Sequence, residues 1–187
     1  MDRRQRKTRQ AIFSAFIELL SKKEYSQITV AEILEKADVG RATFYAHFET
    51  KDYLLKEFCE DLFCHLFDAV SDNEKEHAHI FNCDSKDNVF LHLFSHLQKN
   101  DNNLLRLLSC ANNQLFLQYF KSNLYNLVER ELDKTGDNNE QDLPKSYRVN
   151  VICACFTETV NWWIENGKKQ TPSQLTDYFY KVAKIKK

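Results

Sequence analysis

Apolar residues recur at helical spacing along most of this 187-residue chain. Over residues 4–22 they repeat at i, i+1, i+4, i+7 and i+8, which places them on one face of an α-helix. The same spacing predicts a long helix over residues 50–72 and further helices at about 86–99, 103–110 and 112–134. Because only three glycines and two prolines interrupt the chain, we predict an all-α fold of about nine helices, without a β-sandwich or barrel.

Polar motifs mark the helix starts near the N-terminus. Thr29 and Glu32 have the T-x-x-E spacing of a capping box, followed by the apolar pattern of a second helix. The turn "ADVG" comes next, and we expect Gly40 to supply its backbone freedom. A third, short helix then covers residues 41–47. Three helices in so short a segment, the last two joined by a tight turn, predict a helix-turn-helix unit.

The short helix has one aromatic side and one side of small residues. At ~100° per residue, Phe44 and Phe48 fall together and face the core. The opposite side carries Ala42 and Thr43, whose methyl groups can touch a thymine methyl when the helix enters a major groove. A merely solvated face does not call for alanine. We therefore interpret this side as a DNA-binding surface.

Basic and hydrogen-bonding side chains flank this surface. Arg41 can bind guanine with two hydrogen bonds or contact a phosphate, and Tyr45, His47 and Lys51 can donate to neighbouring phosphates. The charge distribution also favours a DNA-binding surface at the N-terminal end. Residues 1–51 hold ten Lys/Arg against seven Asp/Glu, whereas the remainder holds 16 Lys/Arg against 20 Asp/Glu. A polyanionic partner is therefore expected at the N-terminal end.

The stretch "ITVAEILEKADVGRATFYAHFETKDYLL" resembles the DNA-binding segment of TetR-type transcriptional regulators, over roughly residues 8–60. The resemblance implies that the second helix lies against the DNA backbone and that the third contacts base edges. Carried over position by position, it implies DNA contacts by eight residues: Thr29, Val30, Arg41, Ala42, Thr43, Tyr45, His47 and Lys51. Gly40 departs from the family pattern, in which many members have serine at this position.

The C-terminal stretch "VICACFTETVNWWIENGKKQTPSQL" is similar to that of a Gram-positive (Firmicutes-type) branch of the family, although Glu158 and Thr159 stand where that branch carries glycines. The resemblance implies a helix-turn-helix domain at 1–49, a connecting helix at 50–72 and an effector-binding and dimerisation domain at 73–187. It also implies an effector cavity among the middle helices, with these candidate lining residues: Phe90, Phe94, Leu97, Leu108, Phe116 and Tyr119. An ordinary core would give the same aromatic density.

Two helices finish the chain, the first over about 144–166 and the second from Thr171. The first is apolar over most of its circumference, so we expect both to pair with the same helices of a second subunit. The candidate interface residues are Ile152, Phe156, Val160, Trp163, Leu175 and Phe179. The alternative is that these side chains form an internal core. A twofold dimer would favour a palindromic operator.

Histidine and cysteine positions suggest a narrower possibility. His92 and His96 are four residues apart on one predicted helix, a spacing that can chelate zinc. Other candidates precede them in the sequence: Cys64, His65, His77, His79 and Cys83. Histidines without a site are the alternative, and we assign no metal and no cofactor. The six cysteines form no CxxC pair and are interpreted as small buried residues.

The sequence thus predicts a dimeric transcriptional regulator, a repressor that a small-molecule effector of unknown identity releases from double-stranded DNA. A helical scaffold protein with a decayed DNA-binding face and a metal-responsive regulator are the alternatives. No glycine-rich phosphate loop or G-x-S-x-G motif is present, so no enzyme is expected. No apolar run approaches the ~20 residues of a membrane span, and the N-terminus lacks a signal-peptide pattern. We therefore expect a cytoplasmic protein without a membrane partner.

Overall fold

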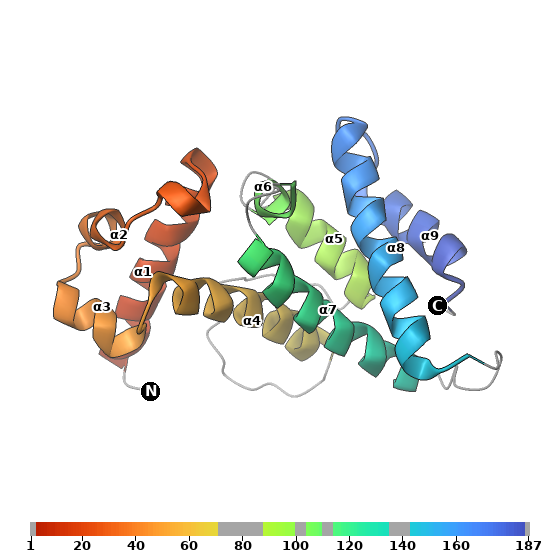
Figure 1. Cartoon of the computed structure of the whole chain (residues 1–187), viewed down its shortest axis with the longest axis horizontal. Coiled ribbons are helices and arrows are strands. Elements are labelled where there is room, and N and C mark those ends of the chain that lie inside the picture. The colour runs from red at the N-terminus through yellow and green to blue at the C-terminus, as the bar shows by residue number, and fades with distance from the viewer. Residues whose placement is uncertain (1–2, 71–87, 100–103, 110–113, 135–142, 186–187) are drawn as a thin grey trace.

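The structure, a computed structural model, describes residues 3–70, 88–99, 104–109, 114–134 and 143–185. Within these ranges the chain forms nine α-helices and one short 3-10 helix, without a strand. The prediction of an all-α fold is confirmed. Figure 1 shows the three N-terminal helices at one end of the molecule and a long helix that leads from them into a bundle of the later helices. Among the described helices, none is both long and apolar enough to cross a membrane.

The N-terminal unit consists of α1 (Arg3–Lys22), the 3-10 helix η1 (Tyr25–Gln27), α2 (Val30–Ala37) and α3 (Arg41–His47). The bounds of α1 and α3 agree with the sequence prediction. The apolar sides of these elements meet in a small core of buried residues: Ile12, Phe13, Phe16, Leu19, Leu20, Ile28, Ile33, Phe44 and Phe48. Burial of this kind stabilises a unit of short helices more than helix propensity does.

The predicted capping box of α2 is confirmed. The Thr29 hydroxyl oxygen accepts a hydrogen bond from the Glu32 backbone N–H (3.3 Å), and the Glu32 carboxylate accepts one from the Thr29 N–H (2.9 Å). The expected role of Gly40 is wrong. Gly40 has φ −71°, which any residue can adopt, whereas Asp38 at the end of α2 has φ 53°. A short polar side chain tolerates this left-handed conformation, so the turn does not require its glycine.

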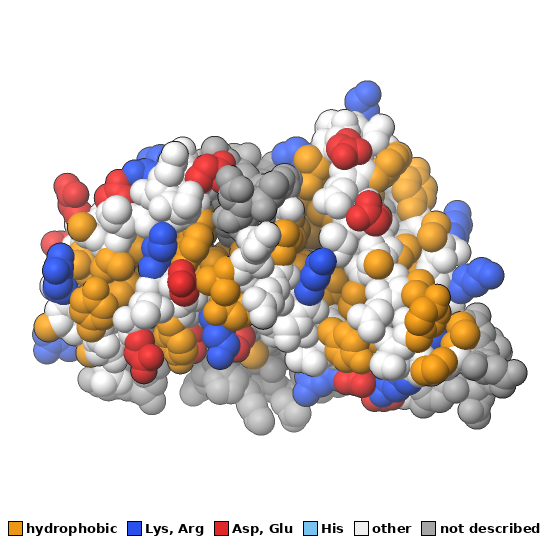
Figure 2. Space-filling view, viewed as in Figure 1, with side chains coloured by type: hydrophobic (Ala, Val, Ile, Leu, Met, Phe, Trp, Pro, Cys, Tyr) orange, Lys and Arg blue, Asp and Glu red, His pale blue; other side chains and the backbone are white. Residues whose placement is uncertain are grey.

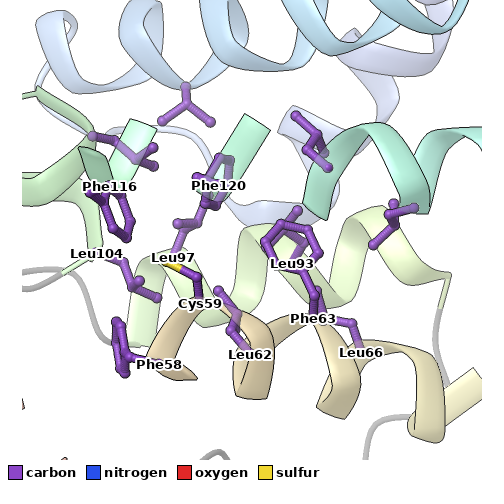
Figure 3. Close-up of a cluster of buried hydrophobic side chains, with 14 of the residues drawn as sticks. Phe58, Cys59, Leu62, Phe63, Leu66, Leu93, Leu97, Leu104, Phe116 and Phe120 are labelled. Carbon is purple, nitrogen blue, oxygen red and sulfur yellow. The ribbon is translucent and has the colours of Figure 1, made fainter. Parts of the chain in front are cut away.

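The long helix α4 (Lys51–Val70) packs against α7 (Gln114–Lys134) and α5 (Val89–Lys99), with α6 (Leu104–Ser109) beside α7. Figure 3 shows the buried side chains that meet between these helices: Phe58, Cys59, Leu62, Phe63, Leu66, Leu93, Leu97, Leu104, Phe116 and Phe120. The N-terminal half of α4 also contacts the first core, because the ring of Phe58 meets that of Phe16 at 6.3 Å. One helix therefore belongs to both ends of the molecule.

The last two helices are α8 (Lys145–Glu165) and α9 (Pro172–Ala183), close to the predicted positions. They pack against each other, and they also contact α7 and α5. Their interior side is aromatic: the ring of Phe156 stacks on Phe94 at 4.7 Å and meets Phe179 edge-on at 5.6 Å. Thr159 stands where the Firmicutes-type branch carries glycine, and it fits within α8. The Thr159 hydroxyl donates a hydrogen bond to the Cys155 carbonyl at 2.8 Å.

This packing corrects the expectation for the dimer interface. Six side chains predicted to meet a partner are at most 3% exposed within a single chain: Ile152, Phe156, Val160, Trp163, Leu175 and Phe179. They form the internal core that was the alternative, because the most apolar side of each helix faces the other helices of the same subunit. Other large apolar residues of α8 and α9 stay exposed: Tyr147, Val151, Trp162, Tyr178 and Val182.

The cysteines of the described residues form no disulfide with one another. Cys59 is buried as expected, and burial raises the pKa of its thiol. The expectation is wrong for Cys64, which is exposed, and Cys153 and Cys155 are half-buried. Two further cysteines lie outside the described residues: Cys83 and Cys110.

Candidate nucleic-acid interface

Helix α3 is held from one side. Phe44 and Phe48 are fully buried, as predicted, and the Phe48 ring meets Phe13 of α1 edge-on at 5.2 Å. The guanidinium of Arg9 lies 5.1 Å from the ring centroids of both Phe13 and Phe48, and it pairs with Glu57 of α4. Arg9 thus covers the aromatic pair and links α1 to α4. No local sequence pattern indicates this role, because it depends on tertiary contacts.

The other side of α3 faces solvent. Its exposed residues are Arg41, Ala42, Thr43, Tyr45 and Ala46. The Tyr45 ring meets the buried Phe44 edge-on at 5.4 Å, yet 49% of the residue remains exposed. His47 is half-buried at the end of the helix. The residues predicted to contact DNA from α3 are therefore brought together on one accessible surface, with small side chains at its centre and longer polar ones around it.

At the start of α2, Thr29 is exposed and Val30 half-buried. The Thr29 hydroxyl also donates to the Glu32 carboxylate at 3.0 Å, so its hydrogen-bonding capacity serves the helix start. Glu32 in turn pairs with Lys23. Chiefly through the hydrogen bond from Lys23, the pKa of Glu32 falls to about 2, so the carboxylate stays charged at neutral pH. Thr29 therefore mainly caps α2.

Lys51, expected on a DNA phosphate, makes contacts inside the protein. Its ammonium donates hydrogen bonds to the backbone carbonyls of Tyr25 (2.8 Å) and Ile28 (2.7 Å) and lies 4.1 Å from the Tyr25 ring centroid. Partial burial lowers the pKa of Lys51. Two of its three N–H donors are thus committed to the loop before α2. Lys51 therefore positions that loop, whatever its third donor contacts.

The candidate effector residues lie in the interior. Phe90, Phe94, Leu97, Leu108 and Phe116 are buried, and Tyr119 is half-buried. These residues lie in two different parts of the core. Phe90 and Phe94 contact the aromatic residues of α8 and α9, including Phe179 at 4.8 Å from Phe90. Leu97 and Phe116 belong to the cluster that α4 shares (Figure 3). The effector cavity stays a prediction.

Three histidines meet between α4 and α5. His65, His92 and His96 are each at most 7% exposed, and the Nε2 atoms of His92 and His96 are 3.0 Å apart. The His65 ring centroid lies 5.0 Å from both other rings. Burial, followed by the other two rings, lowers the pKa of His96 to about 3. Three other candidates lie outside the described residues: His77, His79 and Cys83.

Comparison with known proteins agrees with this geometry. The family model described as "Bacterial regulatory proteins, tetR family" matches residues 12–58, and the model described as "Transcriptional regulator C-terminal region" matches residues 84–184. The structure is similar to that of a TetR transcriptional regulator from Streptococcus agalactiae 2603V. The two share 33% sequence identity with a TM-score of 0.70, over 97% of this chain and 96% of that one.

Two curated relatives add to this. The dhaKLM operon transcriptional activator DhaS of Lactococcus lactis is 28% identical over 160 residues, which cover 82% of this chain and 79% of DhaS. The uncharacterized HTH-type regulator YxbF of Bacillus subtilis is 39% identical over 79 residues, covering 40% of this chain and only 21% of that relative. Both are named as transcriptional regulators and neither as an enzyme. This chain belongs to the TetR family and is a DNA-binding transcriptional regulator, not an enzyme.

Proposed function

We propose that two copies of this chain form a dimer that places α3 of each subunit in successive major grooves of a palindromic operator. The exposed side of α3 carries the proposal. A buried aromatic side fixes the helix, while Ala42 and Thr43 leave its opposite side low enough to approach base edges. Twofold symmetry then sets the spacing of the two half-sites at about one helical turn of DNA.

The residues of this surface have different proposed roles. Arg41 opens α3 and is exposed, so its guanidinium can bind a guanine through two hydrogen bonds. Tyr45 and His47 lie further along the helix and contact phosphates or adjacent bases. Phosphate contacts position the protein and add affinity for any sequence, whereas base contacts select one. The exposed basic residues at the start of α1 strengthen the attraction for DNA: Arg3, Arg4, Arg6 and Lys7.

The proposed dimer uses the sides of α8 and α9 that stay exposed in a single chain. On α8, Tyr147, Val151 and Trp162 fall within about 60° of one another at ~100° per residue. On α9, Tyr178 and Val182 are four residues apart, and the Tyr178 ring meets Trp162 edge-on at 6.2 Å. Figure 2 shows orange side chains gathered over this part of the molecule. Val182 is 72% exposed, a large fraction for an aliphatic side chain.

Regulation is proposed to act through α4. The helix packs on α7 and α5 at one end, and it contacts the N-terminal core through Phe58 and the loop before α2 through Lys51. An effector bound among α5, α6 and α7 that favours one tilt of α4 would change the separation of the two α3 helices. Such a ligand selects between states with different DNA affinity.

The proposed sign of regulation is repression, because a dimer seated on an operator blocks access to the same DNA. Activation is the second candidate, since the Lactococcus relative is named as an activator. A reporter gene placed behind the selected operator separates the two. Lower expression with the regulator present supports repression, and higher expression supports activation.

Selection from random duplexes tests the DNA-binding proposal directly. The expected product is a palindrome, bound with an affinity that falls steeply as salt rises, because phosphate contacts release counterions. Arg41→Ala should change the preferred sequence. If the wild-type chain shows no salt-dependent duplex binding, the proposal fails and the scaffold alternative is favoured.

A further inference from the structure

The histidine cluster joins the connecting helix to the regulatory bundle. His65 belongs to α4, and His92 and His96 are four residues apart on α5. One ring nitrogen from each residue can be chosen so that all three lie within 4.8 Å of one another. Burial penalises the charged form of histidine, so three buried imidazoles together favour the neutral rings that bind metal ions. We propose that these three imidazoles bind one divalent transition-metal ion of the zinc type.

The geometry is close to what such an ion requires. At Zn–N distances of 2.0–2.1 Å, tetrahedral coordination sets ligand nitrogens roughly 3.3 Å apart. The Nε2 atoms of His92 and His96 are already 3.0 Å apart. One nitrogen from each of the three rings lies within 4.8 Å of the other two, so a movement of about 1.5 Å brings the set to the tetrahedral spacing. Rotation of the His65 ring or a small approach of α4 to α5 supplies a movement of this size.

The donor set selects the class of metal. Imidazole nitrogens suit zinc, copper and nickel, whereas magnesium and calcium require oxygen ligands. A histidine binds a metal ion through its neutral imidazole, and burial disfavours the charged form. Three protein ligands leave the fourth position of a tetrahedral ion to water, hydroxide or another small ligand. An anion there would offset the buried positive charge.

A metal at this position would clamp α4 to α5. The DNA-binding unit is attached to the other end of α4, so the ion would favour one placement of α3. This consequence rests on the proposed function, whereas the site itself does not. The alternative is a buried cluster in which His92 and His96 share one hydrogen bond and no metal binds.

Zinc binding to the full-length protein tests the site. The chain is stripped of metal and titrated with zinc chloride in competition with a chromophoric chelator, and bound zinc is counted per chain. We expect one ion per chain. Replacement by cobalt should give the intense visible absorption of a four-coordinate ion. A stoichiometry near zero on the wild-type chain overturns the proposal, and this result needs no variant.

Variants locate the ion. His65→Gln, His92→Gln and His96→Gln should each lower zinc affinity at least ~100-fold, because each removes a ligand. The matched control is His77→Gln with His79→Gln, which should bind zinc as the wild type does. Melting curves without metal identify any variant that fails to fold. For such a position, the visible absorption of the cobalt-loaded wild type tests whether the ion has four ligands. Zinc binding that survives His92→Gln with His96→Gln overturns the proposal.

Duplex binding with and without zinc separates this inference from the proposed function. A protein that binds one zinc ion but no duplex supports the site and contradicts the DNA-binding proposal. A protein that binds its operator but no zinc contradicts the metal site and supports the DNA-binding proposal. A change in operator affinity on adding zinc, absent from His65→Gln, supports the clamp.

Discussion

The ammonium of Lys51, the first residue of α4, donates a 2.7 Å hydrogen bond to the backbone carbonyl of Ile28, the residue just before the N-cap of α2. The same group also binds the Tyr25 carbonyl. Two elements of the DNA-binding unit are thereby tied to the helix proposed to carry the regulatory signal. A lysine predicted to contact DNA is therefore a link between α4 and α2.

Lys51→Met should destabilise the chain by about 1–3 kcal/mol, because it leaves two carbonyls without their charged donor. Urea denaturation measures the change. Lys56→Met is the control, since the Lys56 side chain on the same helix is 43% exposed, pairs with Glu60 at 3.6 Å and lies 5.9 Å from the Tyr53 ring centroid. If Lys51→Met is as stable as the control but binds DNA weakly, Lys51 acts on a phosphate, as the sequence predicted.

Arg41→Ala and Tyr45→Phe should have different effects on DNA binding. Loss of the guanidinium should reduce discrimination at one base pair by about 1–3 kcal/mol, or about 5- to 150-fold, and so broaden the selected sequence. Loss of the Tyr45 hydroxyl should weaken binding to every sequence alike. Competition titrations with the palindrome and single-base variants measure both effects. Lys121→Ala, an exposed change on α7, is the control.

Gly40→Ser should stabilise the DNA-binding unit by a few tenths of a kcal/mol. Gly40 is the N-cap of α3 with φ −71° and ψ 153°, and a Cβ there would lie 3.8 Å from its nearest neighbour, Thr43 Oγ1. A serine hydroxyl at this position can accept from the Thr43 N–H, whereas glycine cannot. Melting temperature measures the gain.

Two controls define the cause of that effect. Gly40→Ala fits the same space without a cap, so it should not stabilise. Gly167→Ala should destabilise by about 1 kcal/mol, because Gly167 has φ 72° and L residues avoid this conformation. A Gly40→Ser chain that melts below the wild type would contradict the capping argument.

Val151→Glu with Val182→Glu should convert the proposed dimer into monomers, because it places charges on the apolar sides of α8 and α9 that are exposed in one chain. Sedimentation velocity measures the mass. Operator binding should weaken as well, since a monomer contacts one half-site. Lys121→Glu is the control for a charge change at an exposed position of α7. A double variant that stays dimeric would place the interface elsewhere.

Local patterns predicted the DNA-binding unit well. The capping box at Thr29, the bounds of α3 and the burial of Phe44 all follow from residues within a few positions of one another. The roles of Lys51 and Arg9 could not be predicted, because each contacts a segment distant in the sequence whose approach the periodicity does not encode.

The C-terminal helices show a different limit. The apolar pattern of α8 indicated that it is covered on more than one side, but it could not tell which side faces its own subunit. The pattern therefore predicts Phe156 at a dimer interface, although Phe156 is fully buried within one chain. The i, i+4 histidines of α5 were visible in the sequence, whereas the position of His65 beside them required the packing of α4 on α5.

Acid should weaken the start of α2 through Glu32. Its folded-state pKa is about 2 against an ordinary value of 4.5, owing first to the hydrogen bond from Lys23 and then to those from Thr29. A depressed folded pKa adds stability above the ordinary value, and this contribution is lost as pH falls from about 5 to 2. Glu32→Gln keeps an acceptor for the capping box but no charge. The wild type should therefore lose more stability than Glu32→Gln over this pH range in urea titrations.

Glu35→Gln, an exposed change on the same helix, should follow the wild type. Equal acid sensitivity of wild type and Glu32→Gln would show that the pair with Lys23 contributes nothing to stability in solution.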